Sequence, residues 1–320
     1  LGVAVNNLQI SSIKLYGNGG GMLPKLNSDF RHNDLVENAI NIYDSNGNGV
    51  FENGDYILFY GQSPHTWKYD AQTSLFKHDT HLFSDEVNYF LTTDNQSNGK
   101  RIEQKQALQN PTKTITSFNA FSFHELELEN LILSGKEWFG ERFDTQNSQS
   151  FDFSFPNLDL TSPVSIKTAV AARSLNPSVF SVAVNSDPLQ SISVQNIVST
   201  YATEYAKTSS NTSVYIASSP NLTVDIEYSS IDNGAMSWLN YIEINARRKL
   251  KMSGNSLLFR DATSFGDEIA SFELSNANIG INVWDVTDPT SVVEMSTSIN
   301  TDELSFNDSI NELHEYIAFN

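Results

Sequence analysis

The residues best suited to chemistry are the oxygen-bearing side chains between Asp44 and Asp55. The segment reads Asp-Ser-Asn-Gly-Asn-Gly-Val-Phe-Glu-Asn-Gly-Asp. In a calcium-binding loop, positions 1, 3, 5, 7, 9 and 12 supply oxygen ligands and a glycine at position 6 makes the sharp turn. The ligands predicted by this spacing are Asp44, Asn46, Asn48, the carbonyl of Val50, Glu52 and Asp55. Because an oxygen-only set on a flexible loop suits calcium better than magnesium, we expect a structural calcium site.

Two features predict a weak to moderate affinity for this site. Position 12 is Asp55 rather than glutamate, and two of the ligands are neutral asparagines, which lowers the charge around the ion. The alternative is a turn-rich hairpin connection without metal, because Asn-Gly and Gly-Asp pairs favour turns by themselves. Apolar residues flank the segment at 39–43 and 56–60, which predicts strand, loop and strand rather than the helices of an EF-hand.

A histidine pair and two charged clusters offer weaker candidates. His78 and His81 could share a zinc ion on a helix, but the flanking residues show no helical period and no third ligand, so exposed loop histidines are the default interpretation. Within an expected strand at 118–133, alternation places Glu125, Glu127 and Glu129 on one face, where they could bind a cation or a basic partner or simply face solvent. The basic run consists of Arg247, Arg248, Lys249 and Lys251. It could meet an acidic partner or a lipid head group, and a solvated strand end is the alternative.

Composition excludes several classes of function. The 320 residues contain no cysteine, so this chain cannot use a cysteine nucleophile, thiolate metal sites or disulfides. The net charge of −19 argues against a nucleic-acid partner, which requires a basic surface. Motifs for serine hydrolases, zinc peptidases and phosphate-binding loops are absent, whereas 38 acidic residues leave a two-carboxylate glycosidase open. Because the chain has no cysteine nucleophile, we expect no enzymatic activity in it, with the glycosidase as the minor alternative.

The chain has no apolar run long enough for a membrane-spanning helix, so we do not expect it to span a membrane. It begins at Leu1 without methionine, from which we expect a fragment or processed product. Abundant Ser, Thr, Asn and Asp with few Lys and Arg suit an extracytoplasmic bacterial protein.

Short alternating segments predict a mainly β, multidomain antiparallel fold with a jelly-roll-like β-sandwich. The clearest segments are residues 151–155, 164–168, 180–184, 214–216, 224–228 and 238–250. Residues 94–116 are polar and form a candidate connection between domains. We expect a β domain with the calcium-type loop at 1–115, a β-sandwich domain at 116–252 and a further β segment at 253–320.

Four motifs follow one another along the chain, at residues 13–17 with 19–24, 54–61, 238–243 with Arg247 and Arg248, and 283–289. Together and in this order they resemble the region upstream of the peptidase domain in the PorU-like sortases of the type IX secretion system, which are gingipain-family cysteine peptidases. The resemblance covers nearly the whole chain. It implies that a peptidase domain with the His and Cys pair of this family follows outside this chain, and that the chain itself is non-catalytic.

By this resemblance, the chain supports the peptidase domain or docks cargo or an outer-membrane partner. The implied partners are the C-terminal domains of type IX cargo and an outer-membrane β-barrel such as PorV, and the implied location is the cell surface in association with the outer membrane. Two alternatives stay open, which are a stand-alone calcium-stabilised surface-binding module and a gingipain-like inhibitory pro-region.

Overall fold

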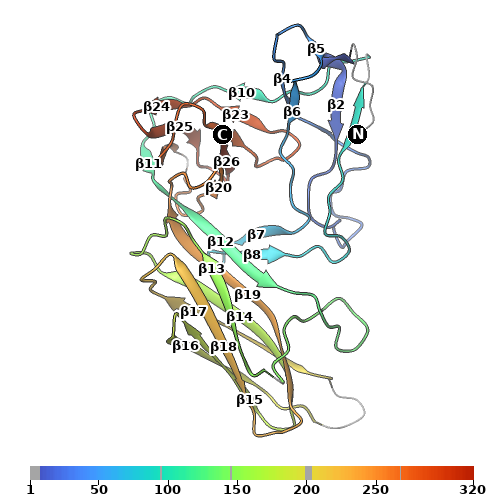
Figure 1. The fold of residues 1–320 in the computed structure, drawn as a ribbon, viewed down its shortest axis with the longest axis vertical. Helices are drawn as coiled ribbons and strands as arrows, with labels where there is room; N and C mark the ends of the chain where they lie inside the picture. The colour runs from blue at the N-terminus through green and yellow to red at the C-terminus, as the bar shows by residue number, and fades with distance from the viewer. Residues whose placement is uncertain (1–7, 94–95, 145, 199–203, 267) are drawn as a thin grey trace. The chain divides into compact units, whose positions relative to one another are not determined.

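A computed structural model describes residues 8–93, 96–144, 146–198, 204–266 and 268–320 (Figure 1). Within these residues the regular elements are β-strands and one 3-10 helix, η1 (Ile10–Ser12). The prediction of a mainly β, antiparallel fold is confirmed. The chain divides into two compact units, one made of Leu1–Lys68, His78–Thr116 and Leu250–Asn320, and the other of Tyr69–Lys77 and Ser117–Lys249.

The second unit contains two four-stranded antiparallel sheets. In the first sheet the order is β12 (Ser117–Glu125), β19 (Met236–Lys249), β14 (Val164–Arg173) and β17 (Lys207–Tyr215). In the second sheet it is β13 (Ser148–Ser154), β18 (Asn221–Ser229), β15 (Ser178–Val184) and β16 (Asp187–Val194). The first strand therefore pairs with the eighth, the second with the seventh, the third with the sixth and the fourth with the fifth. This nesting, divided between two sheets, is the strand order of a jelly roll.

Strict alternation explains how these strands form a sandwich. Along β18, the residues Leu222, Val224, Ile226 and Tyr228 are buried while their neighbours are more exposed, because successive side chains point to opposite faces of a strand. Phe143 and Phe180 meet edge to face in the core, with ring centroids 5.7 Å apart. The predicted long strand at 238–250 is confirmed as β19.

The first unit also pairs two sheets. The five-stranded sheet has the order β10 (Glu103–Lys105), β23 (Val293–Met295), β22 (Asn282–Asp285), β26 (Glu315–Phe319) and β20 (Ser256–Arg260). The four-stranded sheet has the order β11 (Lys113–Ile115), β21 (Ile269–Ser275), β25 (Glu303–Ser309) and β24 (Ser298–Asn300). Rings from both sheets meet in the core, since Phe259 and Tyr316 of the first contact Phe272 and Phe306 of the second at centroid distances of 5.0 to 6.5 Å.

The polarity of residues 94–116 predicts a connection between domains, but two strands of this segment also belong to the sheets of the first unit. β10 pairs in parallel with β23, and β11 pairs in parallel with β21, so this segment supplies an edge strand to each sheet. In consequence, residues 253–320 share one unit with the beginning of the chain, whereas the sequence places a domain boundary between them.

The rest of the first unit consists of small sheets. β3 (Glu37–Asn38), β2 (Ile13–Tyr16) and β9 (Phe90–Thr93) form one sheet, and β1 (Leu8–Gln9) pairs with β5 (Val50–Phe51). β4 (Asn41–Tyr43) pairs with β6 (Tyr56–Leu58), and β7 (Thr66–Asp70) forms a hairpin with β8 (Leu75–Asp79). The tip of that hairpin belongs to the jelly-roll unit, where Asn245 donates to the carbonyl of Phe76 at 3.0 Å and accepts from its N–H at 2.7 Å.

Candidate functional site

The calcium-type loop connects β4 with β6, as strand, loop and strand (Figure 1). Its two terminal carboxylates organise the backbone. Asp44 accepts from the N–H groups of Gly47 and Gly49, each at 2.8 Å. Asp55 accepts from the N–H groups of Ser45 and Glu52, each at 2.8 Å, and these bonds lower the pKa of Asp55.

The remaining predicted ligands also bond within the loop. Asn46 Oδ1 accepts from the N–H of Asn48 at 3.0 Å, and Asn48 Oδ1 accepts from the N–H of Val50 at 2.7 Å. Both asparagine amides donate to Glu52. The Oδ1 atoms of Asn46 and Asn48 each keep a second lone pair, so the geometry leaves acceptors for a cation and equally explains a metal-free turn. Calcium binding at these six residues stays a prediction.

The structure does not bring His78 and His81 into one ligand set within the residues it describes. His78 lies in β8, whereas His81 follows that strand. The Nδ1 atom of His81 accepts from the N–H of Ser84 at 2.9 Å, and the backbone N–H of His81 donates to His65 Nδ1 at 3.0 Å. The second histidine therefore supports the local backbone.

The three glutamates do not share one strand face, because β12 ends at Glu125. The expected strand at 118–133 is therefore too long. Beyond Glu125 the chain bridges Glu129 to Phe139 and then turns at Leu133, which has a φ of 53°. Glu129 accepts from Trp238 Nε1 at 2.7 Å, while burial and the neighbouring Glu125 raise the pKa of Glu127.

The basic run is engaged in internal contacts. Arg247 donates to Asn119 Oδ1 at 3.0 Å and to the carbonyl of Ser117 at 2.8 Å. Arg248 donates to the carbonyl of Pro156 at 2.6 Å, and its guanidinium lies 5.1 Å from the ring centroid of Phe118. Both arginines therefore hold strand ends together inside the jelly-roll unit, which favours the structural interpretation.

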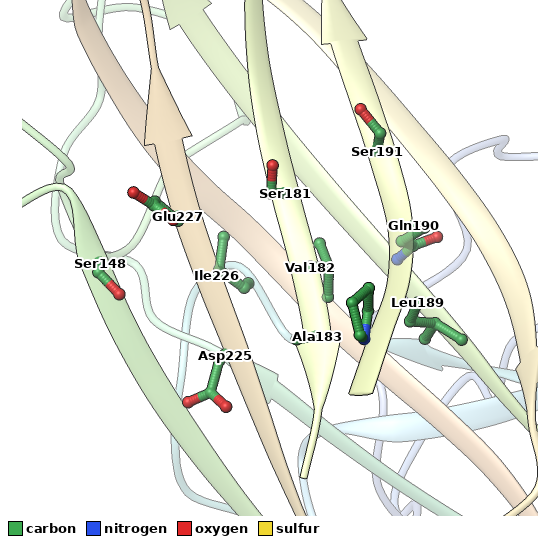
Figure 2. A pocket seen from close by; sticks show the side chains of 11 residues that line it. Ser148, Ser181, Val182, Ala183, Leu189, Gln190, Ser191, Asp225, Ile226 and Glu227 are labelled. Atoms are coloured by element: carbon green, nitrogen blue, oxygen red, sulfur yellow. The ribbon is translucent and has the colours of Figure 1, made fainter. Parts of the chain in front are cut away.

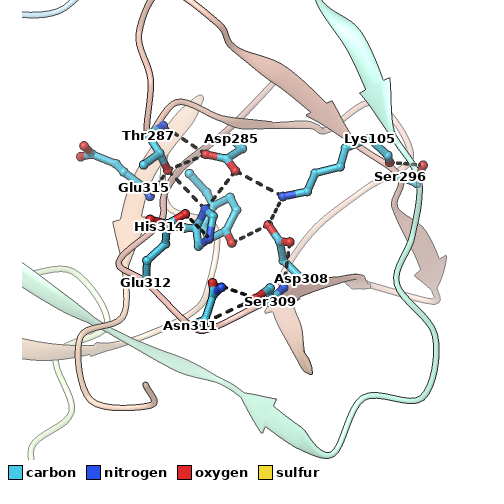
Figure 3. A network of polar contacts seen from close by, with 11 residues as sticks. Lys105, Asp285, Thr287, Ser296, Asp308, Ser309, Asn311, Glu312, His314 and Glu315 are labelled. Atoms are coloured by element: carbon cyan, nitrogen blue, oxygen red, sulfur yellow. Dashed lines mark hydrogen bonds and ion pairs between the residues drawn. The ribbon is translucent and has the colours of Figure 1, made fainter. Parts of the chain in front are cut away.

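A largely buried polar network in the first unit brings several ionisable residues together (Figure 3). Lys105 Nζ lies 2.8 Å from Asp308 Oδ2 and 3.6 Å from Asp285 Oδ2. Tyr316 donates to Asp308 Oδ2 at 2.9 Å, and His314 Nδ1 lies 3.1 Å from Asp285 Oδ2. These five residues come from β10, β22, β25, β26 and the turn before β26, so the network joins strands of both sheets.

Within this network, His314 and Asp285 stabilise each other's charged form. Burial by itself would raise the pKa of Asp285, but hydrogen bonds from His314 and Thr287 outweigh it and leave that pKa below its usual value. Burial by itself would lower the pKa of His314, but Asp285 and Asp308 outweigh it and raise that pKa. The network can therefore hold two carboxylates against two cations, Lys105 and protonated His314, with no net charge.

The same atoms could hold a metal ion. Asp285, Asp308 and His314 each offer one ligand atom, and these three atoms lie within 4.8 Å of one another. Among the described residues, this is the group of three or more His, Cys, Asp or Glu side chains close enough to share a metal ion. Lys105 already contacts both carboxylates, so a metal ion would compete with its ammonium group. Local spacing could not predict this site, because Lys105 and Asp308 are 203 residues apart.

A groove of about 500 Å³ lies over the second sheet of the jelly roll (Figure 2). Ser148, Glu227, Ser181 and Ser191 form one row across its four strands, as the pairing register requires. Asp225 lies in the next row, where it accepts from Ser150 Oγ at 2.5 Å. The residues of β15 that line the groove are small. The groove is therefore open, with serine hydroxyls along its base and the carboxylates of Asp225 and Glu227 on one side.

No helix in the described ranges has the length and apolarity to cross a membrane. No protein-family model matches the chain, and no curated protein matches it either.

The chain was compared with solved structures, and matches were found. The chain matches a region of dimeric latent PorU from Porphyromonas gingivalis with a TM-score of 0.80 and 18% sequence identity. The match covers 96% of this chain and 29% of the PorU chain. An insecticidal delta-endotoxin from Bacillus thuringiensis matches with a TM-score of 0.26 at 12% identity, over 76% of this chain and 43% of its own. At these values the second match carries no structural argument, and the chain has the fold of a region of PorU.

Proposed function

We propose that this chain is a non-catalytic, N-terminal part of a type IX secretion sortase that supports the peptidase domain. The observation that carries the proposal is the match in fold, which covers nearly all of this chain but less than a third of PorU. The chain contains no cysteine, so a peptidase of the gingipain type would require a nucleophile from another segment. Its partners would be the C-terminal domains of secreted cargo and an outer-membrane β-barrel such as PorV, at the cell surface.

A supporting role agrees with the way the chain is built. The polypeptide passes between its two units at residues 68/69, 77/78, 116/117 and 249/250. Each unit therefore depends on segments distant in sequence, and both are built from paired β-sheets. Such a design suits a stable platform better than a string of independent binding modules.

We further propose that Asp44, Asn46, Asn48, Val50, Glu52 and Asp55 bind a structural calcium ion. The support is the ligand spacing together with a closed loop in which Asp44 and Asp55 already fix the backbone. Calcium would stabilise the β4–β6 hairpin and take no part in a reaction.

The experiment that tests the main proposal is intact mass spectrometry of the native polypeptide, combined with the coding sequence beyond Asn320. We expect a mass well above 35.6 kDa and a continuation that carries a histidine and cysteine pair. A native mass equal to that of this chain would refute the proposal and would favour a stand-alone surface-binding module.

A second candidate function is inhibition of the peptidase. The matched PorU structure is described as latent, and a pro-region would inhibit the peptidase when added as a separate chain. Adding this chain to the active peptidase at increasing concentration distinguishes the roles. Saturable inhibition supports a pro-region, whereas unchanged activity supports a platform.

A further inference from the structure

A second cavity lies in the first unit, next to the network of Lys105, because Thr287 lines the cavity and also donates to Asp285 Oδ1 at 2.6 Å. It has a volume of about 380 Å³ and is lined by Tyr60, Gln62, Ser63, His65, Thr66, Trp67, Leu258, Thr287, Leu313 and Glu315. This volume is at the small end of the about 300–1,000 Å³ range of small-molecule pockets. The lining combines two aromatic rings and two leucines with hydroxyl, amide, imidazole and carboxyl groups.

A stacked ion pair fixes the wall of this cavity. Arg260 donates to Glu315 Oε1 at 2.5 Å, and its guanidinium carbon lies 3.9 Å from the centroid of Trp67. Both charged side chains are buried, with 7% of Arg260 and 12% of Glu315 exposed. The Trp67 ring therefore lies against a guanidinium that is itself held by a carboxylate, which restricts its rotamers before any ligand arrives.

Two further polar groups of the lining, Gln62 and Thr287, are also held by hydrogen bonds. Gln62 Oε1 accepts from the N–H of Gly20 at 2.8 Å. This bond fixes the orientation of the side-chain amide, including its NH₂ group. Thr287 Oγ1 accepts from the N–H of Glu315 at 3.0 Å. Burial and the nearby Glu315 raise the pKa of Tyr60 to about 12, so its hydroxyl stays protonated and can donate.

We propose that this pocket binds a neutral saccharide ring. A sugar presents an apolar C–H face to an aromatic ring and hydroxyls that both donate and accept, which matches a lining of Trp67 and fixed polar groups. A cationic ligand is disfavoured because Arg260 already neutralises Glu315, the carboxylate of the lining. An anionic ligand is disfavoured because the lining residues include a carboxylate but no lysine or arginine. This inference does not depend on the proposed function of the whole protein.

Saturation-transfer NMR on the full chain tests the proposal. The probes are the methyl glycosides of glucose, galactose, mannose and N-acetylglucosamine, each titrated to about 10 mM to reach tenfold above a dissociation constant of about 1 mM. Glucuronic acid is the anionic comparison. We expect at least one neutral glycoside to bind, and to bind more tightly than glucuronic acid.

Variants locate the binding site. Trp67→Leu should weaken binding more than tenfold, and Tyr60→Phe, which removes one hydroxyl and keeps the ring, should weaken it about 3- to 10-fold. The matched controls Trp138→Leu and Tyr56→Phe alter partly exposed rings outside the pocket and should leave binding unchanged. If Trp67→Leu fails to fold, Tyr60→Phe against Tyr56→Phe decides alone. The absence of binding by every glycoside, or binding that Tyr60→Phe leaves unchanged, would overturn the proposal.

Discussion

Replacing Lys105 with methionine tests whether the buried network stabilises the first unit. The change removes the ammonium group that lies 2.8 Å from Asp308 and 3.6 Å from Asp285, while most of the apolar stem is kept. Asp308 is fully buried, with 0% of its side chain exposed. It would then keep the hydroxyl of Tyr316 as a donor but would lose its cationic partner.

The size of the effect follows from burial. Removing one partner of a fully buried ion pair costs about 3–5 kcal/mol, because the other charge is left uncompensated. Lys105 is 32% exposed, so water reaches its ammonium group and we expect a loss at or below the lower end, about 2–3 kcal/mol.

The assay is urea unfolding of both proteins at pH 7 with EDTA, followed by circular dichroism and tryptophan fluorescence. Lys113→Met is the matched control, because Lys113 forms an ion pair of the same length with Glu268 but both side chains are 40% or more exposed. That control should lose less than about 1 kcal/mol. A loss in Lys105→Met that is no larger than in Lys113→Met would refute the reasoning.

The same variant tests the capacity for metal. Without Lys105, the ligand atoms of Asp285, Asp308 and His314 would face one another within 4.8 Å, with no ammonium group between the carboxylates. We expect zinc to raise the unfolding midpoint of Lys105→Met and to leave that of the parent chain nearly unchanged. Equal responses to zinc in the two proteins would contradict competition between metal and lysine.

Three further predictions concern the loop, pH and a glycine contact. If the loop binds calcium, chelation of calcium should lower the melting temperature of the parent chain, and Asp44→Ala should abolish this response. The substitution should also lower the melting temperature by itself, because Asp44 accepts two backbone hydrogen bonds. A calcium response that persists in Asp44→Ala would refute the site. The pKa of His314 is raised in the folded state, so its contribution to stability is complete below the ordinary pKa of 6.5 and is lost as the pH rises through the folded-state pKa. The pKa of Asp285 is lowered in the folded state, so its contribution is lost as the pH falls below the ordinary pKa of 3.8. Urea midpoints should therefore fall on the alkaline side in the parent chain and stay flatter in His314→Gln, and identical profiles would contradict this linkage. Gly20→Ala should cost about 1–3 kcal/mol, because its Cβ would lie 2.0 Å from the carbonyl oxygen of Ser63, whereas the control Gly61→Ala would have its nearest contact at 3.6 Å.

The jelly roll could be predicted from the sequence because its strands carry a local signal. Alternation along Phe151 to Phe155 and Val224 to Tyr228 reports burial on one face of each strand without reference to any partner. The hairpin around the calcium-type loop was predictable for the same reason, since Asn-Gly turns and apolar flanks are adjacent in sequence.

The composition of the first unit could not be predicted in this way. β10 and β11 are three residues each and lie in a polar stretch, so neither contains enough alternation to indicate a strand. Both are edge strands whose parallel partners, β23 and β21, lie far along the chain. Lys105 belongs to β10, so the buried network escaped prediction together with the strand that positions it.

The position of the jelly roll within the chain explains why one unit is made of separated segments. The first and last strands of the jelly roll pair from Ser117 opposite Lys249, and the next residue of each connects directly, since Leu250 N–H donates to the carbonyl of Thr116 at 2.7 Å. The inserted segment therefore leaves and rejoins the first unit at neighbouring points. Because its ends are already adjacent, the long insertion adds little loop-closure entropy to the folding of the first unit. Residues 250–320 can then complete sheets begun before residue 116, so the two segments act as one folding unit despite their separation in sequence.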